Sequence, residues 1–163
     1  MIQPPEPLTA EHLLAGFDSG VSSLDDWLRR RALQNQASGA SRTFVACDAG
    51  QVVAYYALAA SAVAPHAAPG RFRRNMPDPI PVVVLARLAI ARDRQGRGLG
   101  RALFQDAANR VIHAADIIGI RGLLVHAISE EANAFYVSLG LEPSPLETMT
   151  LMTTVADLRA TRG

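Results

Sequence analysis

The sequence predicts a mixed α/β fold, with a mostly antiparallel central sheet that includes one parallel pair of strands and has helices on its faces. Residues 43–47 and 52–58 are two apolar runs joined by a turn at residues 48–50, which is the pattern of an antiparallel hairpin. Residues 82–90 and 123–127 are two further apolar runs, and a long helical pattern lies between them. A strand–helix–strand unit pairs its strands in parallel, so the sheet is expected to be mixed.

Caps, periodicity and turn residues predict the remaining elements. Thr9 is placed to cap a short helix ending at Leu14, and Ser23 to cap a longer helix over residues 24–35. Apolar residues recur at helical spacing from Gly98 to about residue 115. No linker or repeat divides the chain, so we expect a single domain over residues 1–163. The other expected elements are a loop over residues 65–81, a helix capped by Ser129 and ended by Gly140, a strand over residues 149–154 and a terminal helix over residues 155–160.

The composition is that of an ordinary folded protein. Hydrophobic residues make up 49% of the 163 residues and charged residues 19%. The net charge of +1 neither requires nor excludes a nucleic-acid partner. Arginine supplies the positive charge and clusters at residues 29–31, 71–74 and 92–101. Its planar fork suits phosphate, although any single cluster is more typical of a solvated surface.

Metal, disulfide and membrane sites have no support in the sequence. Cys47 is the single cysteine and lies in an apolar run, where such a residue usually packs as a small core side chain. The four histidines, His12, His66, His113 and His126, are scattered and form no set with metal-ligand spacing. The N-terminus lacks a basic region followed by an apolar run, and no segment is long enough to span a membrane. We therefore expect no metal and a cytoplasmic location.

The most informative stretch is the apolar strand at residues 82–90, followed by Gln-Gly-Arg-Gly-Leu-Gly at residues 95–100 and the long helix. Glycines let a ligand approach the backbone closely, and the N–H groups of a first helical turn attract anions, so this stretch predicts a phosphate-binding loop. A nucleotide P-loop needs Lys followed by Ser or Thr, but Arg101 and Ala102 follow the last glycine. A dinucleotide fingerprint needs two residues between its last two glycines, and here Leu99 stands alone.

A third pattern, Q/R-x-x-G-x-G/A, fits residues 95–100, which resemble the acyl-CoA pyrophosphate loop of the GNAT-superfamily N-acetyltransferases. Residues 132–141, Ala-x-x-Phe-Tyr-x-x-x-Gly-Leu, resemble a second block of that family. The resemblance implies a GNAT fold whose parallel strands splay apart, with acetyl-CoA as acyl donor. Ser129 stands where many members have an asparagine that contacts CoA. The residues that the resemblance assigns to the cofactor are Leu88, Ala89, Ile90, Gln95, Gly96, Arg97, Gly98, Leu99, Gly100, Arg101, Ser129 and Phe135.

The resemblance also implies a mechanism, in which an amine attacks the thioester carbonyl directly. A backbone N–H near residues 88–90 would stabilise the carbonyl oxygen, and the same strand would pair with the pantetheine arm. Tyr136 would protonate the leaving thiolate, helped by an ordinary tyrosine pKa near 10. A tyrosine considered in isolation is more often an amphipathic residue at the core edge. No general base stands out, but an amine of lowered pKa, such as that of an aminoacyl ester, can lose its proton to water.

Blocks in the N-terminal half resemble a narrower group, the TacT-like acetyltransferase toxins of type II toxin–antitoxin modules. The blocks are Phe17-x-x-Gly20-x-x-x-Leu24-x-x-Trp27-Leu28, Ala32-x-x-Asn35-Gln36, Gly39-Ala40-Ser41-Arg42-Thr43-Phe44-Val45, Tyr55-Tyr56-x-Leu58, Pro79-Ile80-Pro81 and Leu85-Ala86-Arg87-Leu88-Ala89. This resemblance implies acetylation of the α-amine of an amino acid carried by tRNA, which halts translation because a blocked amine cannot form a peptide bond. It also implies a ribbon–helix–helix antitoxin and a homodimer.

Arginines would hold the tRNA backbone in such an enzyme, with salt-dependent affinity. Arg97 is a candidate for this role or for the CoA phosphates. Arg87 alternates out of an apolar strand and is equally consistent with a structural ion pair. The candidate tRNA ligands are Arg71, Arg73, Arg74, Arg87 and Arg92.

Two alternatives stay open at this point. One is a GNAT acetyltransferase that acts on a small amine or a protein amine. The basic loop at residues 65–81 argues against polyamine or aminoglycoside acceptors, whose sites are expected to be acidic. The other is a catalytically idle fold that binds acyl-CoA and acts as a regulator, against which the complete glycine loop and Tyr136 argue.

Overall fold

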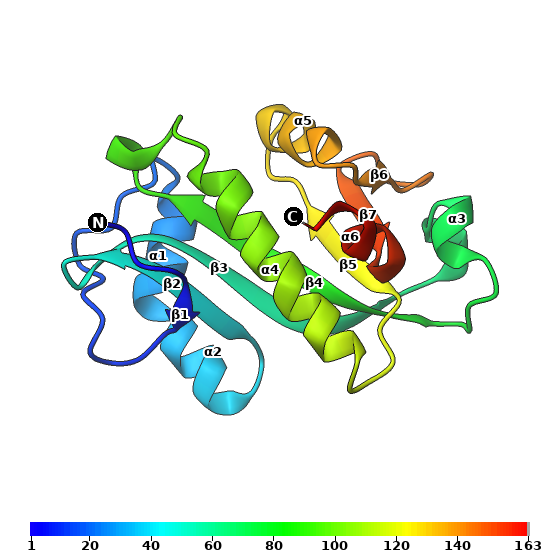
Figure 1. The fold of residues 1–163 in the computed structure, drawn as a ribbon, viewed down its shortest axis with the longest axis horizontal. Helices are drawn as coiled ribbons and strands as arrows, with labels where there is room; N and C mark the ends of the chain where they lie inside the picture. Colours follow the sequence, from blue (N-terminus) through cyan, green and yellow to red (C-terminus); the bar gives the residue numbers. More distant parts are fainter. Residues whose placement is uncertain (163) are drawn as a thin grey trace. The chain divides into compact units, whose positions relative to one another are not determined.

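A computed structural model describes residues 1–162 (Figure 1). Seven strands form one sheet in the order β1–β2–β3–β4–β5–β7–β6. The elements are β1 (Glu6–Pro7), α1 (Ser22–Arg30), α2 (Ala32–Ser38), β2 (Arg42–Asp48), β3 (Gln51–Val63), η1 (Pro65–Ala67), α3 (Gly70–Arg73), β4 (Ile80–Ile90), η2 (Arg92–Arg94), α4 (Leu99–Ala115), β5 (Gly122–His126), α5 (Glu130–Ser138), β6 (Glu142–Pro143), β7 (Thr150–Thr154) and α6 (Val155–Thr161).

The strand pairing confirms the predicted mixed sheet. Strands β4 and β5 pair in parallel, from Val82 opposite Gly122 to Leu85 opposite Val125. The pairs β1–β2, β2–β3, β5–β7 and β6–β7 are antiparallel. The parallel register ends at Leu85, although β4 itself continues to Ile90. None of the helices formed by residues 1–162 has the length and apolar character needed to cross a membrane.

The backbone divides into two compact units. The first comprises residues 1–59 and 86–106, and the second comprises residues 60–85 and the chain from residue 107. Strands β3 and β4 and helix α4 each contribute to both units. The expectation of a single domain over residues 1–163 stays a prediction, and the two units are described one at a time below.

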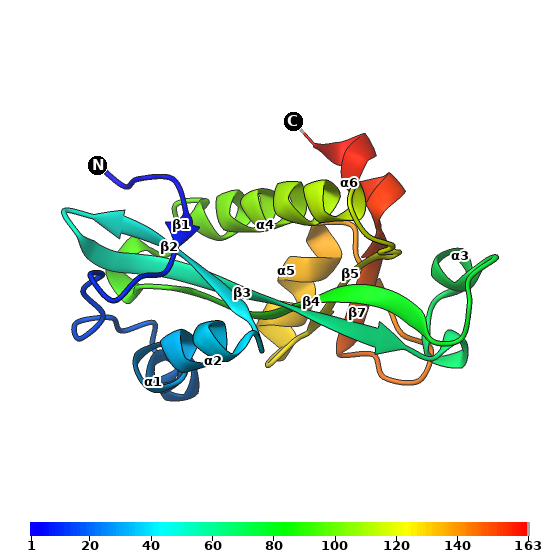
Figure 2. The same cartoon turned by 90° about the horizontal axis from the view of Figure 1, so that it is seen from below.

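In the first unit, the hairpin β2–β3 has helices on both faces (Figure 2). Its turn consists of Ala49 and Gly50, both with positive φ, which matches the twist that a two-residue hairpin requires. Helices α1 and α2 lie on one face, and the start of α4 lies on the other. Tyr55 donates to the Leu24 carbonyl in α1 at 2.7 Å, whereas its neighbour Tyr56 donates to Asp106 in α4. Alternate strand residues therefore reach opposite helical layers.

One helix prediction in this unit is wrong, and a second is correct except for its cap and its continuity. Residues 9–14 begin with a turn in which the Thr9 hydroxyl accepts from the Glu11 N–H, and Leu13 then pairs with Gln51 of β3, which a helix through Leu14 would not allow. The helix expected over residues 24–35 begins at Ser22 and breaks at Arg31, which has φ −121°. Ser23 is not its cap: Val21 occupies that position and makes no side-chain cap bond.

In the second unit, α3, α5 and α6 all contact β7. Arg71 in α3 forms two bonds of 3.0 and 2.6 Å to Asp157 in α6, and Arg121 donates to the Arg71 and Phe72 carbonyls at 2.8 Å. These contacts order part of the segment at residues 65–81 that was expected to be a loop. Gly122 is required by packing, since a Cβ there would lie 2.0 Å from the Thr153 carbonyl oxygen.

The other elements of the second unit follow the sequence closely. Ser129 caps α5, with its hydroxyl accepting from the Ala132 N–H at 3.1 Å, and Gly140 follows the helix with φ +98°. Strand β7 and helix α6 lie within a residue of their expected bounds. The two-residue strand β6 was not predicted, since Glu142 and Pro143 carry no strand pattern.

Candidate active site

The predicted strand–turn–helix is present in the first unit. Strand β4 ends at Ile90, and the Ala91 N–H donates to the Val53 carbonyl of β3 at 2.8 Å. After the short turn η2, helix α4 begins at Leu99, and its Ala102 N–H donates to the Gly98 carbonyl at 3.1 Å. The N–H groups of residues 99–101 precede that bond and have no place in the helical ladder. A helix start with spare donors attracts anions.

Gly96 and Gly98 give this loop its open surface. Both have positive φ, +77° and +80°, which L side chains adopt only with strain. A Cβ built on either would meet no atom within 4 Å, so packing is not what requires glycine. The positive φ is therefore what favours glycine here, and the open space leaves the backbone accessible to a ligand.

An N-terminal turn at residues 17–20 holds the loop in place. The Gln95 amide donates to the Ser19 carbonyl at 2.9 Å and to the Ile90 carbonyl at 2.8 Å. The Arg92 N–H donates to the Asp18 carbonyl at 2.8 Å, and its guanidinium bonds the Asp18 carboxylate at 3.1 Å. The hydrogen bond from Arg92 holds the pKa of Asp18 below its usual value. Gln95 and Arg92, expected to contact ligands, are therefore also structural connections within the first unit.

Asp25 anchors this turn from α1. Its carboxylate is buried and accepts from the Ser19 N–H at 3.1 and 3.2 Å and from the Ser19 hydroxyl at 2.7 Å. The sequence assigned Asp25 no such role. Asp25 lies six residues after Ser19, and no local sequence pattern links either residue to Gln95.

We expect Asp25→Ala to lower stability by about 1–3 kcal/mol, because it leaves a buried N–H and hydroxyl without their acceptor. It should also weaken acetyl-CoA binding, because Ser19 then no longer holds Gln95 firmly. Urea unfolding and a binding titration measure the two effects.

The neighbouring Asp26→Ala is the matched control, since Asp26 forms an exposed ion pair with Arg29 that contributes about 0.5 kcal/mol. Equal unfolding midpoints for the two variants would show that Asp25 does not anchor the turn.

Strand β4 carries the other expected cofactor residues of the first unit. Ala89 is buried in its core, while Leu88 and Ile90 are half-buried. Further along the loop, Arg97 and Arg101 are exposed, and Gly100 lies in the first turn of α4. All of these residues are placed around the loop as the sequence predicted, and their contacts with a cofactor stay predictions.

Arg87 does not form the ion pair that the sequence left open. Its guanidinium lies over the Trp27 ring, 4.5 Å from the centroid, and Trp27 in turn stacks on Tyr55. Its Nε is buried and has no hydrogen-bond partner among the residues that the structure describes. A half-buried cation with a spare donor is suited to an anionic or carbonyl-bearing ligand.

Tyr136 lies in α5 of the second unit. Its side chain is 8% exposed, and Phe135 packs edge-on against it at 5.2 Å between ring centroids. Burial raises the pKa of Tyr136 to about 12, above the ordinary value expected from the sequence. The hydroxyl therefore stays protonated throughout the neutral range. Ser129 already uses its hydroxyl to cap α5.

The arginines of α3 also lie in the second unit. Arg71 is committed to its pair with Asp157, which raises the pKa of Arg71 and lowers that of Asp157. Arg73 and Arg74 are exposed. Of these three, Arg73 and Arg74 are the better placed to meet an external anion.

His126 has a side-chain hydrogen-bond partner that its sequence neighbours did not indicate. Its Nδ1 lies 2.9 Å from the Thr150 hydroxyl, which donates to Glu147 at 3.2 Å. If the Thr150 hydroxyl donates to Glu147, His126 donates from Nδ1, and its Nε2 is left as the basic nitrogen. His126 is therefore a histidine whose tautomer is set by a partner.

Comparison with known proteins matches the acetyltransferase (GNAT) domain to residues 39–143. The chain belongs to the GNAT acetyltransferase family. The matched region of the family contains both the glycine loop and Tyr136. As a GNAT acetyltransferase, the protein is an enzyme of acyl transfer, in line with the sequence prediction.

Three relatives sharpen this assignment. The tRNA-acetylating toxin of Mycobacterium tuberculosis is 54% identical over 150 residues, which cover 92% of this chain and 90% of the relative. The structure of AtaT complexed with acetyl-methionyl-tRNAfMet is 32% identical, covers 98% of each chain and has a TM-score of 0.91. The structure of an AtaT tyrosine-to-phenylalanine mutant bound to acetyl-CoA and the C-terminus of the antitoxin AtaR is 31% identical, covers 98% of this chain and 97% of that one, and has a TM-score of 0.84.

Proposed function

We propose that this GNAT acetyltransferase is a toxin that transfers an acetyl group from acetyl-CoA to the α-amine of aminoacyl-tRNA, and that an antitoxin neutralises it. The observation that carries the proposal is the glycine loop, with open space at Gly96 and Gly98 in front of spare helix donors. The 54% identity to a tRNA-acetylating toxin supports the choice of acceptor.

The loop is suited to the donor. The pyrophosphate of acetyl-CoA is a dianion, and the N–H groups of residues 99–101 with the cations of Arg97 and Arg101 provide complementary charge. We assign Gln95, Gly96, Gly98, Leu99 and Gly100 to the same binding surface. Residues 88–90 would pair with the pantetheine arm and offer an N–H to the thioester oxygen as it becomes an oxyanion. Ser129 and Phe135 would complete the cofactor contacts.

Tyr136 is proposed as the general acid. When the amine attacks the thioester carbon, the tetrahedral intermediate collapses by breaking the C–S bond, and the departing thiolate needs a proton. A tyrosine whose pKa is about 12 is a constant hydroxyl donor at neutral pH. After the transfer, solvent reprotonates the phenolate. The attacking amine loses its proton to water, helped by the electron-withdrawing ester of aminoacyl-tRNA.

The acceptor end requires cations for the tRNA backbone. Arg73 and Arg74 are exposed and ready for phosphate contacts, and Arg92 lies beside the loop. Arg71 would have to share its guanidinium with Asp157. Arg87, over Trp27, would meet the acceptor end rather than a phosphate. The structure of AtaT with acetyl-methionyl-tRNAfMet supports an RNA acceptor. The structure of AtaT with the C-terminus of AtaR supports an antitoxin as partner.

We further propose that the antitoxin is of the ribbon–helix–helix type, that the toxin is a homodimer and that it acts in the cytoplasm. A tail from such an antitoxin, acidic or apolar, would cover the exposed Arg73 and Arg74. The antitoxin type and the homodimer are what the resemblance to TacT-like toxins implies, and size-exclusion chromatography with light scattering measures the oligomer.

The test is an acetyl-transfer assay with labelled acetyl-CoA and, in parallel reactions, total charged tRNA, polyamines or a mixture of proteins. After nuclease digestion we expect labelled N-acetyl-aminoacyl-adenosine, and no such product from tRNA stripped of its amino acids. Label that appeared only on polyamines or protein would replace this acceptor by another amine. Acetyl-CoA binding with no transfer to any of these would identify an idle, regulatory GNAT fold.

A further inference from the structure

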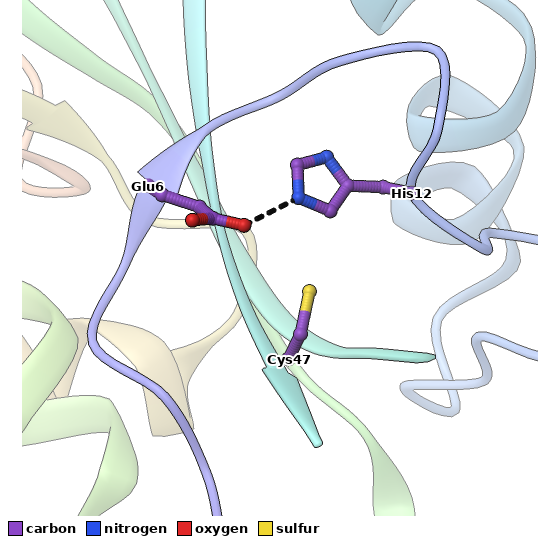
Figure 3. A group of neighbouring side chains, drawn as sticks. All are labelled: Glu6, His12 and Cys47. Atoms are coloured by element: carbon purple, nitrogen blue, oxygen red, sulfur yellow. Dashed lines mark hydrogen bonds and ion pairs between the residues drawn. The ribbon is translucent and has the colours of Figure 1, made fainter. Parts of the chain in front are cut away.

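A cluster of three potential metal ligands lies in the first unit, outside the glycine loop (Figure 3). Glu6 comes from β1, His12 from the turn that follows, and Cys47 from β2. One donor atom from each lies within 4.8 Å of the other two. Figure 3 shows the sulfur of Cys47 pointing toward the space beside the Glu6 carboxylate and the His12 ring. The scattered sequence positions gave no indication of this cluster.

Backbone hydrogen bonds hold the segments of Glu6 and His12 against the β2–β3 hairpin without help from the side chains. Next to His12, the Leu13 N–H donates to the Gly50 carbonyl at 3.3 Å. The Gln3 N–H donates to the Cys47 carbonyl at 2.8 Å, and the Leu8 N–H donates to the Thr43 carbonyl at 2.9 Å. Glu6 is in register with Val45. The cluster is therefore preorganised by main-chain pairing on both sides of Glu6, as a binding site requires.

The contacts of His12 define its protonation. Its Nδ1 accepts from the Thr9 N–H at 2.9 Å, so the neutral ring carries its proton on Nε2, which donates to Glu6 at 2.7 Å. Cys47 is 6% exposed, and burial together with the Glu6 carboxylate raises its thiol pKa. The thiol is thus a poor nucleophile, which argues against a redox or catalytic role.

We propose that Glu6, His12 and Cys47 bind one zinc ion. Thiolate, imidazole and carboxylate are the donors that zinc takes, and in tetrahedral zinc the donor atoms stand about 3.3–3.7 Å apart. The cluster needs a contraction of about 1 Å, which the exposed Glu6 side chain can supply. The Glu6 side chain is exposed to solvent, so a water molecule would be the fourth ligand of the zinc ion.

Protons and charges balance in this step. Zinc displaces the thiol proton of Cys47 to solvent, and the imidazole proton moves from Nε2 to Nδ1. The Thr9 N–H must then release its bond to Nδ1, and the Thr9 hydroxyl, 3.3 Å from Nδ1, accepts the moved proton in its place, as the outer contacts of metal-bound histidines do. One thiolate and one carboxylate neutralise the dication. The ion would clamp the N-terminal segment to β2, and the proposal is independent of acyl transfer.

The test uses the untagged full chain after treatment with a chelator. We expect one zinc per chain by native mass spectrometry, and a thiolate-to-cobalt absorption band when Co²⁺ is the probe. Glu6→Gln and His12→Gln should each weaken zinc binding at least about tenfold, and Cys47→Ala should remove the cobalt band. Zinc should also slow amide exchange over residues 1–13.

His113→Gln is the control, since His113 is an exposed histidine on α4, and it should bind zinc as the parent chain does. The proposal fails if the folded parent chain takes up no zinc at tens of micromolar. It fails equally if Glu6→Gln and His12→Gln bind zinc as tightly as the control, or if the Co²⁺ spectrum lacks the thiolate band. The cluster would then be a Glu6–His12 ion pair beside a buried thiol.

Discussion

Tyr136→Phe should lower the turnover number at least about 100-fold while leaving acetyl-CoA binding unchanged. The substitution removes only the hydroxyl that we propose as general acid, and general acid catalysis contributes factors of that order. The remaining ring keeps its edge-on packing with Phe135. Steady-state kinetics with charged tRNA and a separate titration with acetyl-CoA measure the two quantities.

Val137→Ala is the informative companion, because it changes an exposed neighbour on the same helix and keeps the hydroxyl. It should lose much less turnover than Tyr136→Phe. Because the pKa of Tyr136 is about 12, ionisation of this residue should cause no loss of activity between pH 7 and 9. Full turnover in Tyr136→Phe would remove the residue from the mechanism.

Gly98→Ala should weaken acetyl-CoA binding at least about tenfold, which corresponds to about 1.4 kcal/mol. At φ +80° an alanine is strained by about 1–2 kcal/mol, and its methyl group would stand where the backbone is free of side chains. Isothermal titration with acetyl-CoA and urea unfolding separate the loss of binding from the loss of stability.

Gly50→Ala is the matched control. Gly50 has the same φ of +80° and equally open space around it, but it lies in the β2–β3 turn. Both variants should lose similar stability, and Gly98→Ala alone should lose affinity. A Gly98→Ala protein that bound acetyl-CoA like Gly50→Ala would show that the loop does not hold the cofactor.

The features predicted from the sequence are those that depend on local pattern. The mixed sheet followed from alternating and continuous apolar runs, and the loop followed from glycines between a strand and a helix. The Ser129 cap was visible because capping depends on residues three positions apart. The helix expected after Thr9 was wrong because pairing of Leu13 with Gln51 of β3 outweighs a local capping signal.

Features that depend on distant residues could not be predicted. Ser19, Asp25 and Gln95 form one network, yet the loop residue is 76 positions from the turn that it contacts. His12 and Cys47 meet only because β1 returns along β2. The raised pKa of Tyr136 comes from burial, which a helical pattern indicates only coarsely.

The Gln95 contact with Ser19 suggests a way to inhibit the enzyme from a site outside its substrate-binding surface. Residues 17–20 are a short outlying turn whose carbonyls serve as anchor points for the donor loop. A molecule that bound this turn and separated it from the loop would break the hydrogen bond between Gln95 and Ser19, and the glycine loop would lose its conformation. Because linkage is reciprocal, acetyl-CoA would oppose the binding of such an inhibitor, whereas tRNA, which we do not assign to this loop, would not.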